Sequence, residues 1–336
     1  MNNQAHSSAQ QSQQMRLGAI LYVYKGEWGL PSIDFECLRA LCLIKFTRCP
    51  VKIETNSNPL RSGGGKLPYL QIGNEKIVGY RQIKELLDKE GYPIDAKLMP
   101  KQKFQSVAHT NYVFNNLHAY FNYFMFGEAN NIDCTRALYA KRTPFPFNFY
   151  FPGKYNKEAH NIVSILGGFD LNDKVEVHET DYLVANAKKC VNMLAKKLGK
   201  KVWFFGDFYS EFDAIVYAYL SVLYSISLPN NPLQYHIKSC QNLVNFINRI
   251  SKDVFKQETF NSVKTAKGIT NDPMLTPTER DFLESEKKTK IIAATVALIA
   301  MGTFAAWKGF YQSIVQSNDY YDNYDYGDDD DDTEGE

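Results

Sequence analysis

Cysteine and histidine, which often carry nucleophilic, redox or metal chemistry, are spread along this 336-residue chain without site-like spacing. His109 and His118 stand on one predicted helix, too far apart along it to share a metal ion. No two cysteines have CxxC spacing, and the lack of such pairs is typical of free thiols in a reducing compartment. The cysteines are Cys37, Cys42, Cys49, Cys134, Cys190 and Cys240. The sequence therefore predicts no metal centre and no cofactor, and it favours the cytosol for the main domain.

A glycine-rich segment, RSGGGK at residues 61–66, superficially resembles a phosphate-binding loop. It lacks the G-x-x-x-x-G-K-[ST] spacing and precedes a predicted strand rather than a helix. We therefore interpret it as a flexible loop. The basic residues are dispersed and no recognition motif accompanies them, so a nucleic-acid partner is not expected.

The formal net charge of +1 conceals an uneven distribution of charge. Residues 319–336 contain ten acidic residues and no lysine or arginine. Removing these ten from the 37 acidic residues leaves 27 against 38 basic ones in the rest of the chain. Such a tail cannot bury enough apolar surface to order itself. It acts either as a solvating extension or as a contact for a basic partner.

The first part of the chain has the pattern of a small mixed α/β unit. An apolar run at residues 17–24 predicts a buried strand, and Ser32 and Asp34 provide acceptors at the start of a helix that follows. Residues 51–55 alternate like a strand, residues 67–72 and 76–78 form a predicted hairpin, and residues 80–90 a second helix. The predicted order is β-α-β-β-β-α, with Pro68 opening the third strand.

Beyond Pro93 the pattern is helical. Ser210 and Asp213 form an S-x-x-D capping box, which satisfies amides at a helix start and favours a buried core helix after it. Three prolines are expected to interrupt any helix between residues 129 and 154. The other predicted helices cover residues 102–126, 176–198 with Gly199 as a stop signal, and 233–254 as one amphipathic helix.

The longest uncharged apolar run lies near the C-terminus, at residues 291–307, with lysines on both sides. A helix of these 17 residues is about 25 Å long, slightly short of a bilayer core of about 30 Å. Snorkelling lysines and a thin membrane compensate for that difference. A buried helix in a soluble domain is the alternative. We predict a single-pass anchor whose apolar residues include Ile291, Ile292, Val296, Leu298, Ile299, Met301, Phe304 and Trp307.

Four ordered segments together with this anchor resemble the metaxin family, of the metaxin-1 type: residues 25–34, 58–70, 145–154 and 204–220. The resemblance covers residues 21–307. It implies a glutathione transferase-like fold, with an α+β thioredoxin-like domain, an all-helical domain and a C-terminal transmembrane helix. The expected organisation is a disordered leader (1–16), the thioredoxin-like domain (17–92), the helical domain (93–254), a tether (255–290), the anchor (291–310) and an acidic disordered tail (311–336).

The resemblance implies a function at the mitochondrial outer membrane, with the main domain facing the cytosol. The expected role is in protein import and β-barrel assembly, with a second metaxin-like protein and the barrel subunit of the sorting and assembly machinery as partners. An adaptor role that links mitochondria to motor proteins is an alternative. The leader and the long acidic tail depart from the family pattern, and similar anchors also reach the endoplasmic reticulum.

The fold also raises the question of glutathione chemistry. A transferase activates the thiol with a hydroxyl or thiol near the first strand and helix, and here Tyr22, Tyr24 and Ser32 are the candidates. The clamp for the γ-glutamyl group is normally an acidic residue followed by Ser or Thr, but Gly79 and Tyr80 stand at that position. We therefore predict that the protein is not an enzyme. A membrane-bound glutathione-dependent enzyme is the alternative.

Two features of the transferase-like fold are expected to be retained in a protein that is not an enzyme. The Leu67–Pro68 bond is predicted to be cis, because such a bond shapes the edge of the strand. The remnant groove and the aromatic segment FPFNFYFPG at residues 145–153 are expected to provide partner or membrane contacts. The candidate partner contacts are Trp28, Tyr80, Phe147 and Phe149.

Overall fold

A computed structural model describes residues 18–55, 58–144, 147–171, 177–255, 301 and 303–304. The chain divides into two compact units, Met1–Thr265 and Ala266–Glu336, and the fold described below belongs to the first. The predicted leader, tether and acidic tail lie outside the described residues, apart from Phe255 at the start of the tether. Of the predicted anchor residues, Met301 and Phe304 are described, and both are exposed helical residues.

A four-stranded mixed sheet forms the centre of the first lobe, in the order β2-β1-β3-β4. Strand β1 pairs in parallel with β2 and antiparallel with β3, and β3 pairs antiparallel with β4. The predicted order β-α-β-β-β-α is confirmed, with shorter strands than the apolar runs indicate. The elements are β1 (Ile20–Tyr22), α2 (Phe35–Thr47), β2 (Lys52–Glu54), η1 (Pro59–Ser62), β3 (Tyr69–Ile72), β4 (Glu75–Val78) and α3 (Tyr80–Lys89).

Helix α2 begins where the sequence places acceptors. The Asp34 side chain accepts a hydrogen bond from the Cys37 backbone N–H at 2.9 Å, and the Ser32 hydroxyl accepts one from the Asp34 N–H at 3.3 Å. The helix ends at Arg48, which adopts a left-handed conformation with φ of 53°. Buried residues occupy most of α2 because α3 and α9 pack against it.

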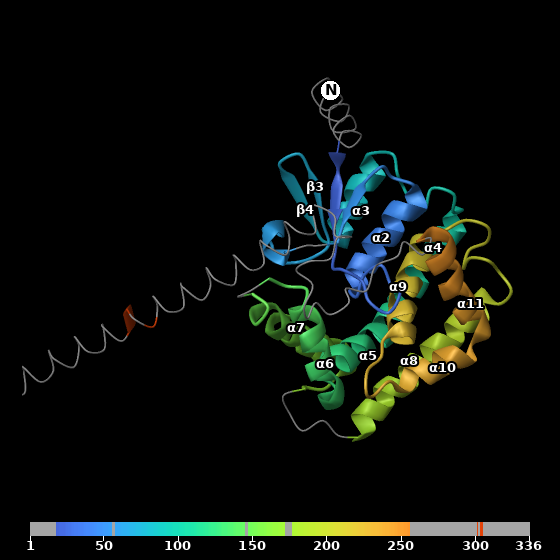
Figure 1. The fold of residues 1–336 in the computed structure, drawn as a ribbon. Helices are drawn as coiled ribbons and strands as arrows, with labels where there is room; N and C mark the ends of the chain where they lie inside the picture. The colour runs from blue at the N-terminus through green and yellow to red at the C-terminus, as the bar shows by residue number, and fades with distance from the viewer. Residues whose placement is uncertain are drawn as a thin grey trace, which may run out of the picture. The chain divides into compact units, whose positions relative to one another are not determined.

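The second lobe is helical throughout the part that the structure describes (Figure 1). The predicted helix at 102–126 is confirmed as a continuous helical stretch from Pro100 to Gly127 that contains two π-helical segments. The elements are α4 (Pro100–Val113), η2 (Phe114–His118), α5 (Ala119–Asn122), η3 (Tyr123–Gly127), α6 (Ala129–Ala140), α7 (Tyr150–Gly167), α8 (Val177–Leu198), α9 (Glu211–Ser225), α10 (Pro232–Ser239), α11 (Gln241–Arg249) and η4 (Ile250–Val254).

One helix prediction was partly right and another was wrong. As expected, the helix is interrupted between residues 129 and 154, because α6 ends at Ala140 and α7 begins at Tyr150. Pro152 does not interrupt a helix: it lies in the first turn of α7, where the backbone N–H has no intrahelical partner to lose. The expected single helix at 233–254 is broken at Cys240, whose φ of −91° and ψ of 79° are not helical. The apolar periodicity continues across this break because α10 and α11 bury their apolar faces in the same core, at Leu233 and Phe246 among others.

Helix α9 is the buried core helix that the sequence predicts, and it contacts α2, α4, α10 and α11. Its capping box is present: the Asp213 carboxylate accepts from the backbone N–H groups of Ser210 at 2.9 Å and Phe204 at 3.0 Å. Burial raises the pKa of Asp213 to about 6, although these hydrogen bonds act in the opposite direction. Among the helices that the structure describes, none has the length and apolar character needed to cross a bilayer.

Candidate functional site

The resemblance places a glutathione site at the end of β1, the turn that follows it, Pro68 and the start of α3. The Leu67–Pro68 bond is cis, as predicted, and the Pro68 carbonyl accepts a hydrogen bond from the Gly79 N–H at 2.8 Å. Gly79 has φ of 88°, a conformation that favours glycine. A carboxylate-bearing residue at this position would therefore be strained, which is consistent with the missing clamp.

Tyr80 occupies the place of the second clamp residue and turns into the protein. Its hydroxyl donates to the Glu211 carboxylate of α9 at 3.0 Å, and the Arg39 guanidinium lies 3.8 Å from its ring centre. Burial, and then the charge of Glu211, raise the pKa of Tyr80. Because the side chain is only 4% exposed, Tyr80 is unsuited to the direct partner contact that the sequence predicted.

Two of the three candidate residues for thiol activation, Tyr22 and Ser32, have structural roles. Tyr22 stacks on Tyr69, with ring centres 4.5 Å apart, which is the packed ring expected within a strand. Ser32 is fully buried and accepts from the backbone at the start of α2. The Ser32 hydroxyl is therefore shielded from a substrate.

Tyr24 belongs to a cluster of three tyrosines that joins the two lobes. Its hydroxyl forms a hydrogen bond with that of Tyr155 on α7, and its ring meets the Tyr139 ring of α6 edge-on at 5.4 Å. The rings of Tyr139 and Tyr155 are also 5.4 Å apart. Burial, followed by the charge of Tyr155, raises the pKa of Tyr24, so its phenol stays protonated at neutral pH. The Tyr139 and Tyr155 rings of the helical lobe therefore pack directly against Tyr24.

Arg142 holds the same interface closed from its edge. At the end of α6, its Nε donates to the Lys25 carbonyl at 2.9 Å, and its guanidinium also bonds to the Gly26 carbonyl and the Glu27 carboxylate. The Arg142 side chain is largely buried and its bonds to the two carbonyls are part-buried, whereas its bond to Glu27 lies at the exposed edge. The turn after β1 is therefore fixed to the helical lobe rather than left open for a ligand.

Sequence reasoning missed Tyr139, Arg142 and Tyr155. Tyr24 and Tyr155 are 131 positions apart, and Arg142 lies 117 positions from Lys25. No local periodicity relates such residues. The one available signal is that Tyr155 directly follows the family-like segment at 145–154.

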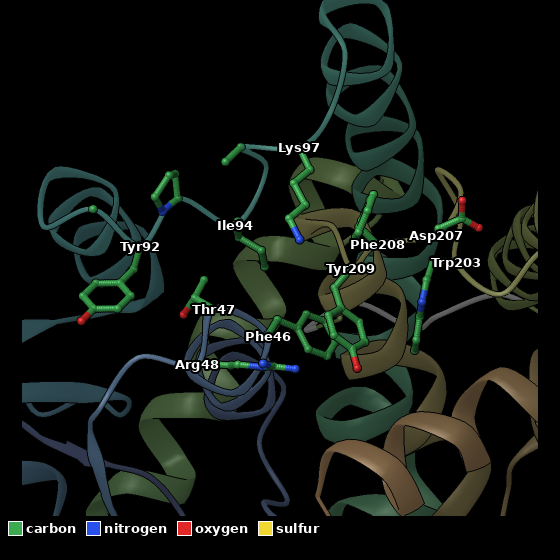
Figure 2. Close-up of a pocket in the computed structure, with 13 residues that line it drawn as sticks. Phe46, Thr47, Arg48, Tyr92, Ile94, Lys97, Trp203, Asp207, Phe208 and Tyr209 are labelled. Atoms are coloured by element: carbon green, nitrogen blue, oxygen red, sulfur yellow. The ribbon is translucent and has the colours of Figure 1, made fainter.

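An open pocket of about 630 Å³ lies elsewhere, between the end of α2, the loop before α4 and the turn before α9 (Figure 2). Tyr209 stacks on Phe46 at 4.3 Å and contacts Trp203 at 4.5 Å, while the Lys97 ammonium lies 4.2 Å from the Phe208 ring. Its lining has aromatic rings and cations but no base paired with a nucleophile.

Metal chemistry has no visible support in the described ranges, where no group of three or more His, Cys, Asp or Glu side chains could hold an ion. His118 is a core residue: its ring accepts or donates a bond with the Tyr219 hydroxyl at 2.8 Å. Burial lowers the pKa of His118 to about 4. The ring is therefore neutral at physiological pH and packs as part of the aromatic core.

Sequence comparisons with known proteins show which families this chain resembles. A family model described as an outer mitochondrial membrane transport complex protein matches residues 37–156, and one described as the C-terminal domain of glutathione S-transferase matches residues 187–250. The chain is 64% identical over 319 residues to the metaxin-1 homolog of Drosophila melanogaster, covering 94% of this chain and 98% of that protein. The chain belongs to the metaxin family.

Other metaxins are more distant. Metaxin-1 of Sus scrofa is 29% identical over 293 residues, which cover 86% of this chain and 90% of the relative. Metaxin-3 of Xenopus laevis is 31% identical over 237 residues, which cover 70% and 76%. These relatives confirm the resemblance to the metaxin family that the sequence segments indicated.

Solved structures similar to this metaxin family member include glutathione transferases. One from Ceriporiopsis subvermispora, in complex with glutathione, aligns with 70% of this chain and 98% of its own, at 13% identity and a TM-score of 0.48. Another from Phanerochaete chrysosporium aligns with 70% and 96%, at 12% identity and a TM-score of 0.46. The matched C-terminal domain family and the observed order of elements give this chain a glutathione transferase-like fold.

The remaining predicted partner contacts differ in how accessible they are. Trp28 and Phe147 are half-buried, and Trp28 packs against the core. Phe149 is 76% exposed at the residue before α7. Phe149 is therefore the most accessible of the predicted contacts.

Proposed function

We propose that this chain is a non-enzymatic scaffold of the mitochondrial outer membrane that acts in protein import and β-barrel assembly. The observation that carries the proposal is the alignment with a metaxin-1 homolog over nearly the whole of both chains. In this proposal residues 291–310 anchor the protein and the two-lobed domain faces the cytosol. The anchor raises the effective concentration of the domain at the membrane, where a second metaxin and the barrel subunit of the sorting and assembly machinery are its partners.

The contacts between the lobes support a scaffold over a transferase. The hydroxyl of Tyr24 is engaged by Tyr155, and Arg142 ties the turn after β1 to the helical lobe. A glutathione molecule would have to displace both contacts and would find no clamp at Gly79 and Tyr80. The fold therefore provides a rigid body with surfaces for docking, without a prepared substrate site.

Depletion of the protein in cells tests the proposal. We expect newly imported β-barrel channel protein to assemble more slowly into the outer membrane, while import of a matrix protein continues at its normal rate. Re-expression of the full chain should restore assembly, and a second metaxin should co-purify with it under mild detergent. Normal β-barrel assembly after complete depletion would overturn the proposed role.

Calorimetry with glutathione at millimolar concentration tests the enzymatic alternative. We expect no saturable heat from the full chain, because Ser32 is buried and the Tyr24 hydroxyl is already bonded. The variant Ser32→Ala should behave like the unmodified chain. Saturable binding that disappears in Ser32→Ala would instead identify a glutathione-dependent enzyme.

A further inference from the structure

The outward face of α7 combines exposed apolar side chains with lysines. Tyr150 at its start is 61% exposed and Ile165 near its end is 80% exposed. Tyr150, Lys154 and Lys157 follow the i, i+4, i+7 spacing that places side chains on one face of a helix. With 18 residues, α7 is about 27 Å long, so this face forms an extended stripe rather than a point contact.

The charge of this region is positive, although Arg142 is largely buried and paired with Glu27. Residues 134–169 contain five lysines and arginines but a single acidic residue, Glu158. That carboxylate is already engaged, because Lys66 of the neighbouring loop lies 3.0 Å from it. On α7 itself, Lys154 and Lys157 outnumber the single acidic residue Glu158, which lies four residues after Lys154 and is paired with Lys66.

The loop after η1 extends the same surface. A Cβ atom at Gly65 would lie 3.3 Å from the Phe151 ring and 3.6 Å from the Lys154 ammonium, so this loop packs directly against the start of α7. Leu60 and Arg61, both exposed, lie in η1 directly before this loop. In Figure 1, α7 lies at the outside of the helical lobe.

We propose that this surface, made by α7, Phe149 and residues 60–66, binds the headgroup region of an anionic lipid bilayer. Aromatic rings are favoured at the membrane–water interface, and lysines next to them are attracted by anionic headgroups. The inference rests on the proposed placement at a membrane and adds a second contact to it. A domain held at both the anchor and α7 is oriented on the bilayer, which leaves its opposite faces available to protein partners.

Fluorescence quenching by brominated lipids tests the proposal on the full chain. The reporter is Phe149→Trp in a chain whose Trp307 is replaced by Phe, reconstituted into brominated phosphatidylcholine vesicles with or without phosphatidylglycerol. Its signal is the difference from the same chain without the Phe149→Trp change, which subtracts the emission of Trp28 and Trp203. We expect strong quenching of the introduced indole when the anionic lipid is present. Quenching should decrease with added salt, because salt screens the attraction of exposed charges.

The matched control is Phe104→Trp in the same background, since Phe104 on α4 is 77% exposed, nearly the same as Phe149 at 76%. Its indole should remain unquenched. The double variant Lys154→Glu/Lys157→Glu should abolish quenching at position 149, whereas Lys101→Glu/Lys103→Glu on α4 should not. Each lysine near an anionic surface accounts for about fivefold in membrane affinity, so two reversals have a large effect.

The outcomes separate this inference from the proposed anchor. The difference in quenching between the unmodified chain and its Trp307→Phe variant, which both contain Trp28 and Trp203, reports insertion of the anchor at Trp307. If Trp307 is quenched but the indole at 149 is not, the lipid contact is wrong while the anchor stands, and a protein partner becomes the occupant of the α7 surface. Equal quenching at 149 with and without anionic lipid would overturn the electrostatic part of the proposal. If Trp307 escapes quenching, the anchor itself is refuted.

Discussion

Removal of residues 288–336 is expected to release the protein from mitochondria into the cytosol. Six of the residues between 291 and 307 are Leu, Ile, Phe or Val, each of which contributes about 0.3–0.6 kcal/mol to membrane insertion. A tagged chain observed by microscopy, together with carbonate extraction of isolated mitochondria, measures the result. The full chain should remain in the carbonate-resistant membrane fraction, and the shortened chain should not.

A single substitution makes the same test without shortening the chain. Ile299→Lys places a charge at the middle of the apolar run and costs about 3 kcal/mol of insertion free energy, more than a hundredfold in the membrane partition. Ile299→Leu should insert normally, and so should a chain that lacks only residues 311–336. A shortened chain that still resists carbonate extraction would contradict the anchor, because a peripheral partner contact does not survive that treatment.

If residues 291–307 cross the bilayer, the acidic tail lies on the side of the outer membrane opposite the two-lobed domain. With the two-lobed domain in the cytosol, a label on Glu336 should be protected from protease added to intact mitochondria. Cleavage of that label would mean that residues 291–307 do not cross the bilayer.

Truncation of Tyr139 is expected to lower the free energy of unfolding by about 4 kcal/mol. Its ring is only 3% exposed and contacts Tyr24, Phe126 and Tyr155, so Tyr139→Ala leaves a cavity between the lobes. Replacing a buried aromatic residue by alanine typically costs about 3–5 kcal/mol. Denaturant unfolding of the full chain in mild detergent measures the change.

Two matched variants show whether packing is the cause. Tyr139→Phe keeps the ring and loses a long hydrogen bond of 3.5 Å to Asp34, so its cost should be about 1 kcal/mol or less. Tyr182→Ala removes an exposed tyrosine and should change stability by less than about 0.5 kcal/mol. A cost near zero for Tyr139→Ala would mean that the cleft tolerates empty space, as a ligand site does, and would weaken the scaffold assignment.

Much of the fold was predictable because its signals are local. The capping box joins residues three positions apart, and the cis bond before Pro68 is a property of one dipeptide in a known strand context. Strand and helix periods repeat within a few residues, which is why the order β-α-β-β-β-α was recovered. The same reliance on local signals made the prediction at Pro152 wrong. A proline in the first helical turn cannot be told from a helix-breaking proline until the start of the helix is known.

The sequence by itself determined the order of elements, the absent glutathione clamp, the family and the apolar run near the C-terminus, since each depends on neighbouring residues. Only the tertiary structure decided which side chains bond across the two lobes. The Tyr80–Glu211 and Tyr24–Tyr155 bonds each join residues 131 positions apart, and they exist because two lobes pack together. Likewise, α7 became a basic and aromatic surface only once folding buried one face of the helix and exposed the other.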